Sequence, residues 1–210
     1  MKCFRCIVII QFVTAVALGQ SAQQRKATSS PERPDALVQS LYQEVVARAP
    51  VGIPSGADLK ILTPYLSMAL QHRIALARAC GNDWLSLHKN LSVKPPFAWL
   101  EAGLFSGQDE RTGPKAFAIE RTESENDGSS HVYVTLKWWE TSDNNADRWH
   151  VTPNRPVIWR VAAIVVRENK HFALDDVIYL KDKDHNNELR LSELLTKGCD
   201  GSHWVGYTNR

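Results

Sequence analysis

The chain contains 210 residues, of which 25 are basic and 23 are acidic, so its formal net charge is only +2. A protein with a net charge this close to zero lacks the excess of basic side chains that binding to nucleic acid or to anionic lipid requires. We therefore expect no nucleic-acid partner. A chain of this length can form one domain with an ample hydrophobic core, and no internal repeat marks a second one.

Residues 1–19 have the pattern of an export signal. Lys2 and Arg5 form a short positive head, an apolar run extends from Cys6 to Leu18, and the small residues around Gly19 offer a cleavage site. The run is too short to cross a bilayer permanently, which takes about 20 residues. We therefore expect a signal peptide and a secreted or periplasmic mature protein that has no net charge and no stable membrane insertion. The alternative is a buried N-terminal helix.

Signal cleavage leaves two of the four cysteines in the mature chain, because Cys3 and Cys6 lie within the signal. An even pair in an oxidising compartment predicts a disulfide between Cys80 and Cys199. Their wide separation does not oppose the bond, since the cost of loop closure grows slowly with loop length. The alternative is two separate buried thiols.

The mature chain begins with a polar stretch, residues 20–33, which has no apolar period and indicates a flexible leader. The single domain then spans residues 34–210. Pro34 suits the first turn of a helix, and apolar side chains from Leu37 to Ala49 continue it at helical spacing.

A second helix is predicted to begin at Thr63-Pro64, a capping residue followed by a proline. Gly81 fits the left-handed residue that ends a helix, which places Cys80 at the helix end. The segment Phe97–Phe105 fits either a strand or a short helical turn.

The second half of the chain changes to strand patterns. Strands are expected at Ala116–Thr122 and His131–Trp139, and Val157–Leu180 indicates two long strands joined by a two-residue turn at Asn169-Lys170. Leucines at helical spacing within Asn186–Lys197 indicate a short last helix. Helices followed by antiparallel strands predict an α+β fold, in which N-terminal helices pack on a curved antiparallel sheet and a short C-terminal helix follows.

This order of elements resembles the cone-shaped nuclear transport factor 2-like superfamily. Within it, the export signal, the helix start Leu62-Thr63-Pro64-Tyr65-Leu66 and the strand Phe172-Ala173-Leu174-Asp175-Asp176-Val177 are similar to an uncharacterised family of exported bacterial proteins. The resemblance covers roughly Asp35–Leu180. It implies an interior pocket in which superfamily enzymes place acidic side chains, but no assigned reaction.

Asp176 is the acid that the predicted hairpin places among apolar neighbours. In the register that the turn sets, Asp176 faces Ala163 and shares a face with Trp159. A carboxyl buried there without a cation would have a raised pKa and could act as a general acid or base. The alternative is an ion pair with Arg73 or Arg78, or exposure to water. Asp176, Trp159 and Arg73 are therefore the candidate pocket residues.

A polar segment near the C-terminus has the spacing of a calcium loop, at Asp182, Asp184, Asn186, Leu189 and Glu193. The alternative is a polar turn followed by a helix cap. We assign no metal site to this pattern, and no motif in the sequence predicts a cofactor.

These observations favour an exported, non-catalytic domain that binds a small ligand or a protein of the cell envelope on the concave side or the edge of its sheet. The alternative is a small pocket enzyme, of hydrolase, isomerase or dehydratase type, that uses Asp176 as general acid or base. A lower alternative is a calcium-stabilised structural domain.

Overall fold

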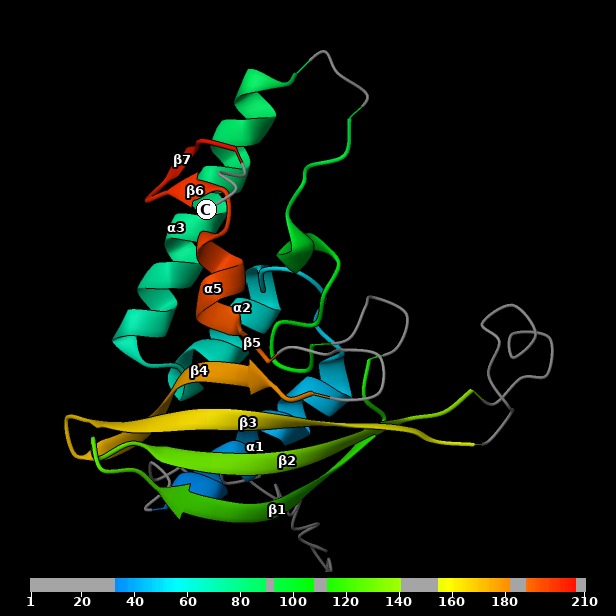
Figure 1. Ribbon diagram of the computed structural model, residues 1–210, viewed down its shortest axis with the longest axis vertical. Helices are drawn as coiled ribbons and strands as arrows, with labels where there is room; N and C mark the ends of the chain where they lie inside the picture. The colour runs from blue at the N-terminus through cyan, green and yellow to red at the C-terminus, as the bar shows by residue number, and fades with distance from the viewer. Residues whose placement is uncertain (1–32, 90–92, 108–112, 141–154, 182–187, 207–210) are drawn as a thin grey trace, which may run out of the picture.

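A computed structural model gives the arrangement of the chain in space (Figure 1). It describes residues 33–89, 93–107, 113–140, 155–181 and 188–206. The predicted signal peptide, the leader up to residue 32 and residues 182–187 of the calcium-like segment lie outside these ranges. Among the described residues, no helix combines the length and the hydropathy that crossing a membrane demands.

The first helix, α1 (Pro34–Arg48), begins at the predicted proline. Pro34 occupies the first turn, where its missing N–H costs no hydrogen bond. Leu37, Leu41 and Val45 are buried along one face of the helix. The helix ends at Ala49, whose φ of 43° lies in the left-handed region and turns the chain away.

The second helix begins later than predicted. Thr63-Pro64 opens only a short 3-10 turn, η1 (Thr63–Tyr65), which follows α2 (Gly56–Leu62), a helix that the sequence did not predict. The long helix α3 (Met68–Leu87) starts after Ser67, whose Oγ accepts the N–H of Leu70 at 2.9 Å. The hydroxyl cap at Ser67, rather than the proline, therefore fixes where α3 starts.

The predicted end of this helix at Gly81 is also wrong, because α3 continues for almost two further turns. Gly81 lies inside the helix, where a Cβ atom would come within 2.9 Å of the Cη2 atom of Trp99. The glycine therefore allows the indole ring to approach the helix closely. Trp99 belongs to the short turn η2 (Ala98–Leu100), which resolves the ambiguous segment as helical.

Within the described residues, the antiparallel sheet has five strands in chain order. Its strands are β1 (Ala116–Ser124), β2 (Ser130–Trp138), β3 (Val157–Glu168), β4 (His171–Tyr179) and β5 (Leu189–Arg190). The short helix α5 (Leu191–Thr196) and the hairpin of β6 (Cys199–Asp200) and β7 (His203–Trp204) follow. The predicted α+β fold with a short C-terminal helix is confirmed.

The β3–β4 turn is confirmed at Asn169-Lys170, whose φ angles of 46° and 73° suit a two-residue hairpin. The predicted register fails farther along the hairpin. A β-bulge leaves Asp175 without a partner, and Asp176 faces Ile164 instead of Ala163. The bulge shifts every later residue of β4 to the opposite face, since side chains alternate along a strand.

One face of the sheet carries the main core. α1 packs across β1, β2 and β4 on this face, whereas α3 starts at β4 and extends beyond the strands (Figure 1). Trp138 and Trp159 are both buried in this core. The opposite face carries a second, smaller apolar cluster of Ala162, Ile164 and Ile178.

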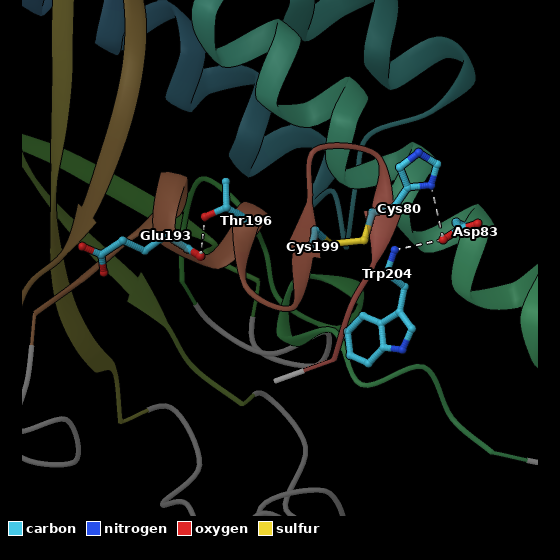
Figure 2. Close-up of a disulfide and its surroundings, with 7 residues drawn as sticks. Cys80, Asp83, Glu193, Thr196, Cys199 and Trp204 are labelled. Atoms are coloured by element: carbon cyan, nitrogen blue, oxygen red, sulfur yellow. Dashed lines mark hydrogen bonds and ion pairs between the residues drawn. A yellow bond between two sulfur atoms is a disulfide. The ribbon is translucent and has the colours of Figure 1, made fainter. Parts of the chain in front are cut away.

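The predicted disulfide is confirmed between Cys80 on α3 and Cys199 on β6 (Figure 2). Asp83, three residues farther along α3, accepts the backbone N–H of Trp204 at 2.9 Å and lies 3.9 Å from His203. The bond and these contacts fasten the C-terminal hairpin to α3.

Candidate functional site

Asp176 is 5% exposed, and three hydrogen bonds satisfy its carboxylate. Oδ1 accepts the N–H groups of Val177 and Ser192 at 2.9 and 3.0 Å, and Oδ2 accepts the Ser192 hydroxyl at 2.6 Å. The cation nearby is Arg190, 3.9 Å from Oδ2, rather than the predicted Arg73 or Arg78. Because Ser192 lies in the first turn of α5, Asp176 caps that helix and fastens it to β4.

Arg73 contacts the neighbouring acid, Asp175. Its guanidinium donates to the Asp175 carbonyl oxygen at 3.2 Å and lies 3.6 Å from the carboxylate. The Ser67 hydroxyl, which also caps α3, donates to Asp175 Oδ1 at 2.6 Å. The two adjacent acids therefore fasten two different helices to the same strand, α3 through Asp175 and α5 through Asp176.

Trp159 is a buried anchor for a segment of the chain, residues 104–106. Three successive carbonyl oxygens of this segment accept hydrogen bonds from interior side chains: Leu104 from Tyr179 at 2.6 Å, Phe105 from Tyr42 at 2.7 Å, and Ser106 from Trp159 at 2.8 Å. Burial raises the pKa of both tyrosine hydroxyls above the ordinary value. At this point the helix-facing side of the sheet is filled by the 104–106 segment and its aromatic partners.

A pocket of about 270 Å³ lies instead beside the C-terminal half of α3, and we call it the α3 pocket. Helix α3 contributes one wall, and two loop segments contribute the others. Its lining consists of Val51, Gly52, Ile53, Arg78, Gly81, Asn82, Leu85, Pro95, Phe97, Trp99 and Leu100. Neither Asp176, Trp159 nor Arg73 is among these residues.

The deep side of the α3 pocket is aromatic and its rim is apolar and exposed. Phe97 and Trp99 are buried and stack with ring centres 4.7 Å apart. Leu85 and Val51 are 53% and 41% exposed and lie together at the pocket. An apolar ligand would cover both side chains and gain their contact area.

A single cation supplies most of the polarity of the α3 pocket. Arg78 is half-buried and donates from Nη2 to the Pro54 carbonyl oxygen at 2.6 Å. Within the described part of the chain, no carboxylate lies within ion-pair distance of Arg78, and no acidic side chain lines the pocket. Asn82, which is exposed, is another polar side chain of the wall.

A second pocket, of about 530 Å³, lies between the β3–β4 turn and the start of α3. It contains Lys60, Glu168 and His171, and Glu168 accepts the N–H of Met68 at 3.1 Å. This carboxylate therefore supports the first turn of α3. The pocket is shallower and carries charges of both signs, so it specifies a ligand less clearly than the α3 pocket does.

The sequence contained a weak signal for the α3 pocket that prediction missed. Arg78, Gly81, Asn82 and Leu85 follow the spacing of one helix face, so α3 presents them together. Because the predicted helix ended at Gly81, Asn82 and Leu85 were not assigned to the same helix face as Arg78. The loop residues on the other walls carry no periodic pattern that would have joined them to the helix.

No group of three or more histidine, cysteine or acidic side chains within the described ranges could hold a metal ion. Comparison of the chain with protein-family models, with curated proteins and with solved structures gave no match.

Proposed function

We propose that the protein is an exported, non-catalytic binding domain on a scaffold of the nuclear transport factor 2-like kind, and that the α3 pocket is its ligand site. The observation that carries the proposal is the exposed apolar rim of Leu85 and Val51 over the buried ring stack of Phe97 and Trp99. A concave, mostly apolar site with a few polar groups is typical of small-molecule binding.

Three further features support parts of this proposal. The disulfide supports export, because such bonds persist in oxidising compartments. The order of helices before sheet supports the scaffold. The hydrogen bonds of Asp176 favour a structural role over general acid–base chemistry, because they hold the carboxylate against α5.

Titration of the mature protein with 3-phenylpropanol, followed by NMR of the backbone amides, tests the site. This neutral probe has roughly ten non-hydrogen atoms, and at about −0.4 kcal/mol per atom its Kd would be on the order of 1 mM. We expect saturable shifts at Gly81, Leu85 and Leu100.

Two leucines on the same helix give a matched pair of variants. Leu85→Asp places a charge on the pocket rim and should abolish binding, whereas Leu87→Asp, at a 64% exposed position outside the lining, should leave it unchanged. If neither 3-phenylpropanol nor a charged probe with the same phenylpropyl body bound saturably, or if both variants lost binding equally, the α3 pocket would be ruled out as the site.

A further inference from the structure

We infer that the α3 pocket selects small apolar carboxylates, with Arg78 as the group that recognises the acid. The inference rests on the proposed function and adds the chemical class of the ligand to it. It follows from the charge, the geometry and the size of the pocket.

The charge of the pocket is of one sign. Of the described residues that line it, Arg78 is the only charged one. Two described acids that adjoin the lining in the sequence have partners outside it: Asp83 contacts the C-terminal hairpin, and Glu101 forms an ion pair with Lys94. A half-buried cation without an acidic partner favours an anionic ligand, because an anion would compensate its charge where water is partly excluded.

The contacts of Arg78 favour a carboxylate among the possible anions. A guanidinium carries five N–H donors in a planar fork. The Pro54 carbonyl oxygen takes one of these donors and holds the group beside the pocket wall. Donors that remain can bind the two oxygens of a carboxylate in parallel, which is the geometry that arginine matches best.

The size and the lining of the pocket determine which apolar body the ligand can have. A volume of about 270 Å³ holds roughly nine water-sized groups at ~30 Å³ each. The aromatic side chains Phe97 and Trp99 favour a flat or chain-like apolar body over a sugar or a polyanion. A monocarboxylate with an aryl or short alkyl body satisfies the single cation and fills the space.

Three probes with the same apolar body separate the contributions of charge and shape. 3-Phenylpropionate, 3-phenylpropanol and 3-phenylpropylammonium are titrated into the mature protein at pH 7 and low ionic strength, by calorimetry or NMR. We expect the acid to bind at least tenfold more tightly than the alcohol and the ammonium compound to bind most weakly. The preference for the acid should shrink as salt is added.

Variants of the protein test whether Arg78 causes the preference for the acid over the alcohol. Arg78→Met should reduce acid binding to the level of the alcohol, whereas Lys89→Met, which removes an equal charge at an exposed position outside the lining, should preserve the preference. Arg78→Lys should keep only part of the preference, because an ammonium group cannot bind both oxygens in the arginine geometry.

The results of these titrations test the carboxylate inference and the proposed function separately. Equal binding of acid and alcohol, or tighter binding of the ammonium probe, would overturn the carboxylate inference and leave the proposed function intact. Absence of binding by all three probes would overturn the proposed function itself. If Arg78→Met fails to fold, as judged by circular dichroism, the probe series on the unmodified protein still decides whether the site prefers a carboxylate.

Discussion

Tyr42 places its hydroxyl in the core, where the side chain is fully buried and donates to the Phe105 carbonyl oxygen. Burial disfavours the phenolate strongly, and the pKa of Tyr42 therefore lies far above its ordinary value of 10.0. The native state keeps this proton at pH values where the unfolded chain releases it. Tyr42, together with the buried Tyr179, thus makes the stability of the fold depend on alkaline pH.

We expect Tyr42 to lower the free energy of unfolding as the pH rises above about 10. Its contribution is fully present below that pH, and above it the unfolded state binds fewer protons, so the stability that Tyr42 contributes falls by about 1.4 kcal/mol per pH unit. Urea unfolding from pH 8 to pH 11 measures the slope. Tyr42→Phe should be less stable at neutral pH by about 1 kcal/mol but should decline less steeply in alkali. Identical slopes in the two proteins would contradict this account.

At the scale of elements, the bulge in β4 explains why two aspartates stand side by side in a buried strand. Neighbouring residues of a regular strand point to opposite faces, so two adjacent carboxylates would be directed apart. The unpaired position of Asp175 breaks this alternation, and both carboxylates contact helices. Consecutive acids in an apolar strand are therefore a sequence signal for a bulge, one that the predicted register ignored.

Asp176→Ala should destabilise the fold by about 2–3 kcal/mol, because it leaves the Ser192 N–H without its acceptor and removes the charged cap of α5. For a domain of this size the melting temperature should fall by roughly 4–12 °C. Ser192→Ala should lower the free energy of unfolding less in the Asp176→Ala variant than in the unmodified protein, because the two side chains share a hydrogen bond.

Asp200→Ala, at an exposed position on β6, is the control and should melt like the unmodified protein. If Asp176→Ala also melted like the unmodified protein, the carboxylate would not be structural, and the acid–base alternative would regain support.

At the scale of the whole molecule, the sequence predicted what depends on local patterns and on simple chemistry. Alternation identified β2, turn residues identified the β3–β4 hairpin, and the predicted export signal together with cysteine number identified the disulfide. The α3 pocket could not be predicted in this way, because its walls come from three separate segments of the chain. Only packing, such as that of Trp99 against Gly81, brings them together.

The disulfide is the covalent link between the helical half of the chain and its C-terminal end. Cys80 and Cys199 are separated by 119 residues, so the bond closes most of the domain into a loop. In the chain-entropy view, such a bond restricts the unfolded state and contributes up to about 4–5 kcal/mol. Contacts of Asp83 with Trp204 and His203 would still hold the hairpin after reduction, although much more weakly.

We expect Cys80→Ala/Cys199→Ala to fold but to lose about 2–5 kcal/mol of unfolding free energy. Urea unfolding of the mature protein, with and without reductant, measures the loss. Reductant should lower the stability of the unmodified protein and leave the double variant unchanged, which separates the bond from the packing of the two side chains. Titration of the denatured, unreduced protein should find no free thiol. Two free thiols, together with a midpoint that reductant does not move, would mean that the bond is absent from the native protein.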